Sequence, residues 1–473
     1  MEQSVEIKNG QTASFEGQIL PNENKFRDQD TRTEVVGLDI GTTKVVAIVG
    51  RKNQFGKVEI LGYGKASNKG VKSGVVINLT ETIKAINEAV QKAEYNSKIK
   101  IKKVVVGIAG QHIRSIQTRE YIMRENPEDI ITQEEIDKLI KQVERINVEA
   151  GEKIIHALPQ EFMVDDEGNI PEIPIGMAGT RLEANFHVVV GKVASIQNLI
   201  RCVKMANLEV ESVTLEPLAS SDAVLLEEEK EGGIALIDIG GGTTDLAIFK
   251  NNIIRHTAII PYGGNVVTQD LANGIQVLKR NAEAIKKRFG SAWPAENSDM
   301  EVVSIQGLPG RPPVEISLKS ISRIIKARVE EIMQIVDAEI KRYTESNPNS
   351  ALLGGVVLTG GGAELKHLPQ LVNLITGYYT RVGHPNQHLA SGTEEDLKSP
   401  IYATAVGLLM KGLDNKLNYE YYEEQDELKA AQQIEKEAVK EEEKVVEKKK
   451  PSMQKKRNKS FFDSLFDFIK KLE

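Results

Sequence analysis

The 473-residue sequence has only one cysteine, so an intramolecular disulfide is excluded, and no Cys/His cluster has the spacing of zinc ligands. This favours a reducing, cytoplasmic location. We expect Cys202, in the stretch LIRCVKMANL, to be a buried helix residue. No run of about 18 apolar residues is present, and no basic region followed by an apolar run marks the N-terminus. The sequence therefore predicts neither a membrane-spanning helix nor a signal peptide.

The net charge is small for a chain of this length, −7 at pH 7, which gives no reason to expect a nucleic-acid partner. A composition with 40% hydrophobic and 27% charged residues is that of a globular protein. The length allows two or more domains, because single cores rarely grow beyond about 300 residues. Neither GxxxxGK[ST] nor GxGxxG occurs, which argues against the P-loop and dinucleotide-binding folds.

Two segments of the chain repeat one pattern of a strand, an Asp, a Gly/Thr turn and a second strand. They are VVGLDIGTTKVVAIVG and ALIDIGGGTTDLAIFK, and their aspartates, Asp39 and Asp238, are 199 residues apart. The repeat predicts a duplicated half-molecule. Glycines let backbone N–H groups approach phosphate oxygens, Thr hydroxyls donate further bonds, and an adjacent Asp can hold Mg²⁺ through water. Each hairpin alone is equally typical of a tight turn, but two facing hairpins would clamp a polyphosphate.

Five motifs occur in the order found in the actin-like ATPase superfamily: LDIGTTKV, LEPLASS, LIDIGGGTTDLAIF, LTGGGAEL and YATAVGLL. The segments IIPYGGNVVTQDLA, AEAIKKRFG and GLPGRPP resemble more closely the FtsA family of bacterial cell-division proteins. The resemblance covers roughly Glu34 to Gly412 and the C-terminal tail. It implies an α/β fold of the actin-like two-domain type, with duplicated ribonuclease-H-like halves, an inserted 1C-type subdomain, and a C-terminal amphipathic helix on a flexible tether.

The expected division of the chain combines this resemblance with the texture of the sequence. The parts are a disordered N-terminal arm (1–33), subdomain 1A (34–103 and 191–231), the inserted subdomain 1C (104–190), subdomain 2A with a hinge helix (232–260 and 329–414), subdomain 2B (261–328), a charged linker (415–459) and a membrane-targeting helix (460–473). For the early part of the linker, a helical extension held by Glu/Lys pairs is an alternative. Ala405 and Gly407 are expected in the hinge helix, where the two halves meet.

The resemblance also implies ATP and Mg²⁺ as cofactors and assigns residues to one site. The first phosphate loop would comprise Asp39, Gly41, Thr42, Thr43 and Lys44. The second would comprise Asp238, Gly240, Gly241, Gly242, Thr243 and Thr244. The adenosine would lie against Gly360, Gly361, Gly362 and Glu364, with Glu283 and Lys286 contacting the ribose or base. An exposed helix pair is an equally good interpretation of these last two residues.

Asp39 and Asp238 would hold Mg²⁺ through water, and Asp245 and Glu216 are candidates for orienting the attacking water. Such a cleft implies at most slow ATP hydrolysis and no metabolic reaction. The resemblance further implies self-association through subdomain 1C and docking of the C-terminal peptide of the tubulin-like protein FtsZ on subdomain 2B. Basic residues there could meet an acidic peptide, although each could equally be a solvated surface charge: Arg311, Lys319, Arg323 and Lys326.

The chain ends in SFFDSLFDFIKKLE, which predicts an amphipathic helix. Its apolar face would comprise Phe461, Phe462, Leu465, Phe466, Phe468, Ile469 and Leu472. At about 1.5 Å per residue it is too short to span a bilayer and would lie in the interface, where Lys470 and Lys471 meet anionic phospholipid. Docking of this helix on the folded core or on a partner groove is the alternative.

These features together predict a polymerising, ATP-binding adaptor on the cytoplasmic side of the cell membrane. It would tether FtsZ filaments there during septum assembly and recruit later division proteins. The alternative is an actin-fold ATPase or small-molecule kinase whose C-terminal helix docks on the protein itself. A DnaK-type chaperone would need a substrate-binding β-domain after the second half, and that space holds only the linker and the terminal helix.

Overall fold

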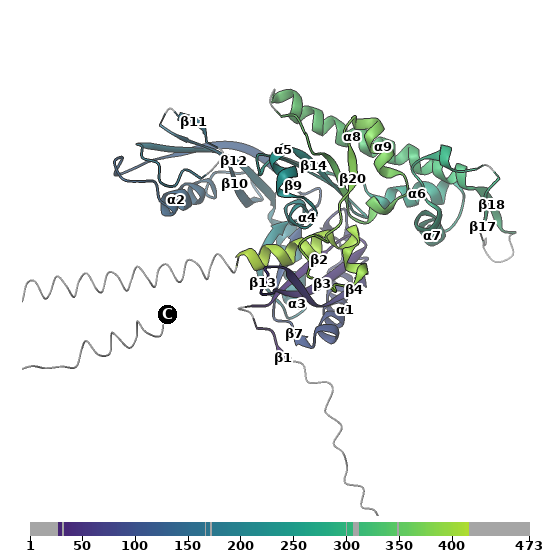
Figure 1. The fold of residues 1–473 in the computed structure, drawn as a ribbon. Coiled ribbons are helices and arrows are strands. Elements are labelled where there is room, and N and C mark those ends of the chain that lie inside the picture. The colour runs from purple at the N-terminus through teal and green to yellow at the C-terminus, as the bar shows by residue number, and fades with distance from the viewer. Residues whose placement is uncertain are drawn as a thin grey trace, which may run out of the picture. The chain divides into compact units, whose positions relative to one another are not determined.

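Two five-stranded sheets of the same topology form the centre of the computed structural model (Figure 1). In each, three consecutive strands form an antiparallel meander, the first strand of the meander pairs in parallel with a fourth, and the fourth pairs in parallel with a fifth. The first sheet consists of β2 (Val35–Ile40), β3 (Lys44–Lys52), β4 (Val58–Ser67), β8 (Lys103–Ile108) and β13 (Glu209–Leu215). The second consists of β14 (Ile234–Ile239), β15 (Thr244–Lys250), β16 (Ile253–Ile260), β19 (Gly355–Thr359) and β20 (Thr380–Val382). The predicted duplication is confirmed.

The structure describes residues 27–30, 33–165, 167–170, 173–298, 300–305, 312–347 and 350–415. The part up to Asp414 forms one unit and the remainder a second. The predictions for residues 1–26, Arg311, the linker from residue 416 and the terminal helix at 460–473 lie outside the described residues. None of the described helices is both long and apolar enough to cross a lipid bilayer.

Helices cover the outer face of each sheet. The first sheet packs against α1 (Leu79–Ser97) and α3 (Val193–Met205), which bury Ile86, Leu199 and Cys202 in one core. Burial raises the pKa of the Cys202 thiol to about 11, and the prediction of a buried helix residue is confirmed. The second sheet packs against α6 (Gly264–Gly274), α8 (Leu318–Ser346) and α9 (Leu368–Thr376). The central strands β2 and β14 are buried along their whole length, as apolar runs covered on both faces should be.

A third core lies between the two sheets and contains the helices that connect them. It joins Ile48 of β3 and Leu236 of β14 to α4 (Glu216–Val224) and to the helix formed by residues 403–415. These two helices cross closely, because a Cβ placed on Gly407 would lie 1.8 Å from the carbonyl oxygen of Ala219. A Cβ on Gly37 of β2 would likewise lie 2.6 Å from the carbonyl oxygen of Ala405. Backbone packing therefore requires glycine at position 407, one of the two residues predicted for the hinge helix, and at position 37.

The chain between β8 and α3 forms a separate, smaller sheet with the strand order β11-β10-β12-β9. Its elements are β9 (Ile113–Met123), α2 (Gln133–Val143), β10 (Glu152–Val164), β11 (Glu167–Ile170) and β12 (Arg181–Lys192). This insert has a core of its own, which includes Phe186. Thr132 is the N-cap residue of α2, and the Glu135 side chain accepts a hydrogen bond of 3.0 Å from the backbone N–H of Thr132.

The insert also contacts the second sheet, whose edge strand is β16. Gln160 donates to the carbonyls of Ile254 (2.6 Å) and Arg255 (3.3 Å), and Ser115 donates to the carbonyl of Thr257 (3.3 Å). Arg255 forms an ion pair with Glu161 at 2.6 Å. The insert therefore belongs to the first half by chain connection and covers the edge of the second half.

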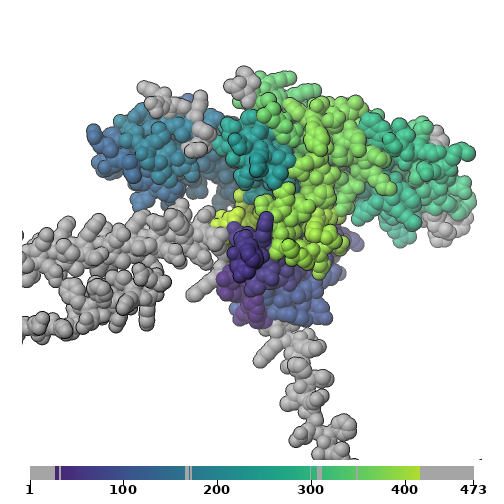
Figure 2. All heavy atoms as spheres, in the orientation of Figure 1, coloured from purple at the N-terminus to yellow at the C-terminus, as the bar shows by residue number. Residues whose placement is uncertain are grey.

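The remaining elements are short or lie in the region between α6 and α8. They are β1 (Arg27–Asp28), β5 (Val71–Lys72), β6 (Val75–Val76), β7 (Ile99–Lys100), α5 (Glu227–Gly232), α7 (Lys279–Phe289), β17 (Val302–Ile305), β18 (Val314–Ser317), and 3-10 turns at Pro294–Glu296, Gly361–Glu364, Glu395–Lys398 and Pro400–Tyr402. The insert, in blue, and the α6–α8 region, in green, project from the two-sheet body on different sides (Figure 2).

The predicted disordered arm at residues 1–33 is wrong for its last residues. The strand β1 pairs in parallel with β7, and the buried Gln29 accepts hydrogen bonds from the backbone N–H groups of Lys102 and Lys103. The polar composition suggested disorder, but this amide satisfies two backbone donors that would otherwise lack partners. Residues 27–29 are therefore part of the folded unit.

Candidate functional site

A cleft lies between the two halves and contains two adjoining cavities. The first has a volume of about 100 Å³ and is lined by both Gly/Thr hairpins, with Glu216 and Asp245 beside them. The second has a volume of about 410 Å³ and is lined by α7, α8 and the turn after β19. Lys44, Gly241 and Gly361 are among the residues that line both cavities. The cleft therefore has a small acidic end and a larger end with more apolar lining.

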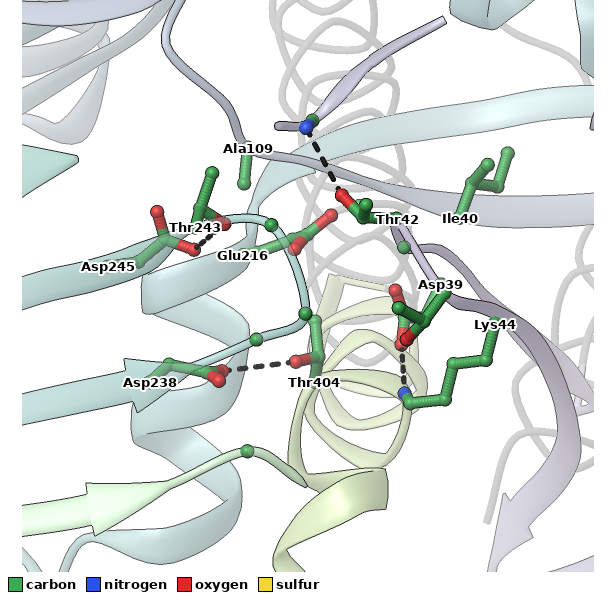
Figure 3. A pocket seen from close by; sticks show the side chains of 18 of the residues that line it. Asp39, Ile40, Thr42, Lys44, Ala109, Glu216, Asp238, Thr243, Asp245 and Thr404 are labelled. Atoms are coloured by element: carbon green, nitrogen blue, oxygen red, sulfur yellow. Dashed lines mark hydrogen bonds and ion pairs between the residues drawn. The ribbon is translucent and has the colours of Figure 1, made fainter. Parts of the chain in front are cut away.

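The two hairpins contact each other across the acidic end. A Cβ on Gly241 would lie 2.4 Å from the Cγ2 atom of Thr43, and a Cβ on Gly242 would lie 2.5 Å from the Oγ1 atom of Thr42. The Thr42 hydroxyl accepts a hydrogen bond of 3.4 Å from the backbone N–H of Gly74 (Figure 3). Since only glycine leaves room for these contacts, the turn sequences determine how closely the halves approach.

Each hairpin holds one aspartate at the cleft, near the end of its first strand (Figure 3). Asp39 forms an ion pair with Lys44 at 2.8 Å. Asp238 accepts hydrogen bonds from Ser220 (2.7 Å) and Thr404 (3.2 Å). Both carboxylates are almost fully buried, with 3% and 8% exposure. The acidic end thus contains charged groups that the folded chain holds in place.

Two further carboxyl groups lie in the same cavity with shifted pKa values. Burial raises the pKa of Asp245 well above its usual value, and the nearby Asp238 raises it further. Burial also raises the pKa of Glu216 strongly, with added repulsion from Asp39 and Asp245. Burial alone would lower the pKa of the Lys44 amine. The negative charge of Asp39 outweighs this effect, so the pKa of Lys44 is raised. Four carboxyl groups therefore face one firmly charged amine.

This excess of acid fits a divalent cation. Within the described part of the chain, the Oδ1 atom of Asp245 is buried without a hydrogen-bond partner, and its Oδ2 atom accepts a 3.3 Å bond from Thr243. Among the described residues, no three His, Cys, Asp or Glu side chains are arranged to hold a metal directly. A cation bound through water molecules, as Mg²⁺ often is in nucleotide sites, agrees with both observations.

Asp245→Asn tests the charge balance of this cavity. A carboxyl group whose pKa is raised on folding makes the folded state bind more protons than the unfolded state, so its contribution to the free energy of unfolding falls as the pH rises. We expect the melting temperature of the variant to rise relative to wild type between pH 5 and pH 8, without divalent cations. Thermal unfolding at both pH values measures this difference, and parallel curves for the two proteins would contradict it.

The larger cavity brings together the other predicted residues. Lys286 of α7 donates to the carbonyl of Gly264 (2.8 Å) and to Thr268 (2.7 Å), and pairs with Glu283 at 2.8 Å. Burial would raise the pKa of Glu283, but Lys286 outweighs it and the pKa is lowered. Burial lowers the pKa of Lys286. The alternative of an exposed helix pair is therefore wrong, since both residues line the cavity and are fixed by contacts within it.

The structure places all but one of the predicted cleft residues on the two cavities. Gly360, Gly361, Gly362 and Glu364 lie at the turn after β19 and line one or both of them. Thr244 lines neither. Its side chain is fully buried and donates to the carbonyl of Tyr262 at 2.9 Å. Because β15 begins at this residue, its side chain points to the opposite face from Thr243 and Asp245.

Several cleft residues escaped the sequence prediction. Ser220 and Thr404 bond Asp238, and Gly263 and Gly264 line the larger cavity. Lys65 of β4 lines it as well. Both hydroxyl residues lie within motifs that were recognised, LEPLASS and YATAVGLL, but nothing in those motifs indicates which side chains face the cleft.

Comparison with known proteins gives consistent matches. Residues 235–407 match the family model described as cell division protein FtsA, and residues 110–190 match the SHS2 domain inserted in FtsA. The chain is 37% identical over 382 residues to the cell division protein FtsA of Pseudomonas aeruginosa, covering 81% of this chain and 90% of that protein. It is 34% identical over 393 residues to the FtsA protein of Escherichia coli, covering 82% and 92%.

Among solved structures, the PilM-PilN type IV pilus biogenesis complex contains a chain of similar fold. The TM-score is 0.59 at 17% identity, covering 81% of this chain and 99% of that chain. Together with the paired sheets, this confirms for the described residues the predicted α/β fold of the actin-like two-domain type. The domain match over residues 110–190 agrees with the predicted inserted subdomain.

Proposed function

The chain belongs to the FtsA family of cell division proteins, and on this premise we propose that it binds ATP with Mg²⁺ in the cleft and forms polymers. We further propose that it tethers FtsZ filaments to the cytoplasmic face of the cell membrane at the division septum, where later division proteins join. The observation that carries the nucleotide proposal is the meeting of two duplicated Gly/Thr hairpins over a buried acidic cluster.

Each end of the cleft would bind a different part of the nucleotide. The backbone N–H groups of the hairpin glycines and the Lys44 amine would bind the phosphates, since Lys44, Gly240 and Gly241 line both cavities. The larger cavity would hold the adenosine, between Glu283 and Lys286 on one side and Gly361 and Gly362 on the other. Its apolar lining from α8, which includes Ile332 and Met333, suits a flat base.

Mg²⁺ would be held through water by Asp39 and Asp238, and it would neutralise phosphate charge. Asp245 and Glu216 would orient or accept a proton from a water molecule near the terminal phosphate, which makes slow hydrolysis chemically feasible. The contact between the two hairpins requires the halves to separate slightly when the phosphates enter. Bound nucleotide would thereby set the distance between the halves.

Lys286→Ala tests the nucleotide proposal. The variant removes an amine that fixes the backbone of Gly264 and the Glu283 carboxylate, so we expect ATP affinity to fall about tenfold, measured by titration with a fluorescent ATP analogue. Arg280→Ala, at an exposed position of the same helix that lines neither cavity, is the control and should bind as the wild type does. Failure of the wild type to bind ATP would refute the proposal, and equal affinity of both variants would remove Lys286 from the site.

Membrane attachment is proposed on the sequence of residues 460–473, which lie outside the described residues. Each Phe, Leu or Ile buried in the lipid interface could contribute about 1.5–3 kcal/mol, but ordering the helix costs about 1–2 kcal/mol per residue. Lys470 and Lys471 would add attraction to anionic phospholipid. A single tail would therefore bind weakly, and a polymer that carries many tails would bind by avidity.

FtsZ docking is proposed on the α6–α8 region. Lys319, Arg323 and Lys326 follow one another at helical spacing on α8. The start of this helix is bonded to the segment that carries the exposed apolar side chains of Met300 and Val302, because Leu318 donates to the carbonyl of Glu301 at 2.8 Å. Basic charge beside apolar surface suits an acidic peptide with hydrophobic anchors. We propose the subdomain limits and the partner role of Arg311 on the resemblance alone.

Polymerisation is supported by the exposed apolar side chains on the insert. Tyr121, Met123 and Ile130 are 48%, 61% and 60% exposed. Exposed apolar side chains of this size suit contact with another protein chain, including a second copy. The alternative function, an actin-fold ATPase or small-molecule kinase with a docked helix, would require ATP turnover that a small substrate stimulates.

A further inference from the structure

Two hydroxyl groups from different helices converge on one oxygen atom of Asp238. Ser220 of α4 donates to Oδ2 at 2.7 Å. Thr404, from the helix at 403–415, donates to the same atom at 3.2 Å, as Figure 3 shows. The two hydroxyl oxygens are 3.1 Å apart. Ser220 is fully buried, and Thr404 and Asp238 are each 8% exposed. Water therefore has little room to replace either donor.

The second oxygen of the carboxylate is in a different environment. Asp238 Oδ1 lies beside Gly360, where a Cβ atom would approach it to 2.3 Å. Gly360 has φ +78° and lines the acidic cavity together with Asp238 and Thr404. Among the described residues, no other side chain donates a hydrogen bond to this oxygen. One oxygen of Asp238 is thus held by the chain, and the other remains beside the cavity.

The two donors stand where the halves are joined. Ser220 follows Ala219, whose carbonyl contacts the backbone of Gly407, one helical turn after Thr404. Asp238 itself belongs to β14 of the second sheet. A carboxylate from the second half is therefore fixed by the two helices that connect it to the first, and rotation about this crossing would alter both hydrogen bonds.

We propose that Ser220 and Thr404 are positioning residues for the divalent cation of the bound nucleotide. Their hydroxyls fix Oδ2 of Asp238, which presents Oδ1 to the water shell of the cation at the acidic end of the cleft. The inference rests on the proposed nucleotide function and adds two residues to it. It also predicts that cation binding is sensitive to the relative placement of the two connecting helices.

The alternative role of this pair is purely structural. A buried carboxylate needs hydrogen bonds in any case, and loss of a donor would then destabilise the fold without a special effect on the cation. The two roles differ in one measurable respect. A positioning role affects nucleotide binding in the presence of Mg²⁺, whereas a structural role affects binding with and without Mg²⁺ alike.

The test is a titration of the full-length protein with a fluorescent ATP analogue, once with Mg²⁺ and once with EDTA. Thr404→Val keeps the shape of the side chain but removes the donor, and we expect the dissociation constant with Mg²⁺ to rise about tenfold while the value in EDTA stays the same. Ser220→Ala should show the same split. Thr404→Ser restores the hydroxyl and should restore the wild-type dissociation constant.

Thr359→Val is the matched control. This threonine is buried and is the partner of Asp238 in the register between β14 and β19, but its hydroxyl donates to the carbonyl of Gly383 at 3.4 Å. It should leave both dissociation constants unchanged. If Thr404→Val fails to fold, Ser220→Ala tests the same carboxylate from the other helix.

Each result decides between the roles. Equal weakening in Mg²⁺ and in EDTA, or no weakening in either, would overturn the positioning role. Wild-type binding that does not depend on Mg²⁺ would overturn it as well, because Asp238 would then hold no cation. A wild-type protein that binds no nucleotide under either condition would refute the proposed function itself, and the inference with it.

Discussion

Gly407→Ala should lower the free energy of unfolding by about 3 kcal/mol, a large effect for a substitution that usually stabilises helices. The added Cβ would lie 1.8 Å from the carbonyl oxygen of Ala219 and 2.2 Å from its carbonyl carbon. Both obstacles are backbone atoms of α4, so no side chain can rotate away. The two connecting helices would have to separate, which would loosen the core that they share.

Chemical denaturation of the nucleotide-free protein measures this loss as a lower midpoint. Gly232→Ala is the control, because Gly232 is likewise a helical glycine without positive φ, and the nearest atom to its added Cβ would be 3.7 Å away, on the Leu353 side chain. The control should be neutral or slightly more stable. Similar midpoints for Gly407→Ala and wild type would mean that α4 and the helix at 403–415 are not packed as closely as the structure shows.

Deleting residues 460–473 should abolish flotation of the protein with liposomes that contain anionic phospholipid. Under conditions where most of the wild-type protein floats, we expect less than about a tenth of the deletion variant to do so. The reason is that the terminal residues supply the apolar face on which membrane binding is proposed to depend. Flotation through a density gradient measures the bound fraction directly.

Point substitutions separate the apolar face from the rest of the tail. Phe462→Asp combined with Phe466→Asp should reproduce the deletion, because two carboxylates cannot enter the lipid interface. Asp463→Asn combined with Asp467→Asn changes only the polar face and should bind at least as well as wild type, since it removes negative charge. Undiminished flotation of the deletion variant would disprove the anchor.

Local patterns predicted the elements that depend on neighbouring residues. The hairpins at Asp39 and Asp238 and the helix around Cys202 each lie within a few residues of the signal that indicates them. The duplication followed from comparing two such segments. The prediction of disorder from composition was wrong for residues 27–30, because the hydrogen-bond partners of Gln29 lie more than seventy positions away, at Lys102 and Lys103.

The contacts that complete the site depend on the tertiary fold. Thr404 reaches Asp238 across 166 positions, and Ser220 belongs to a helix whose face toward the cleft is set by its crossing with Gly407. Thr244 sits in the predicted motif, yet the alternation of β15 turns it away. A motif thus identified the segment that contributes to the cleft, while strand register and helix crossing decided which of its side chains enter.

The insert covers the edge strand β16, and this has a consequence for variants from which the insert is deleted. An edge strand of a sheet has unpaired main-chain N–H and C=O groups that can pair with strands of other molecules, and natural proteins usually protect such strands. Here the side chains of Gln160 and Ser115 donate hydrogen bonds to main-chain carbonyl groups of β16. A protein from which the insert is deleted would therefore expose β16 as an unprotected edge strand. Aggregation through this strand would obscure any activity that the shortened protein retained.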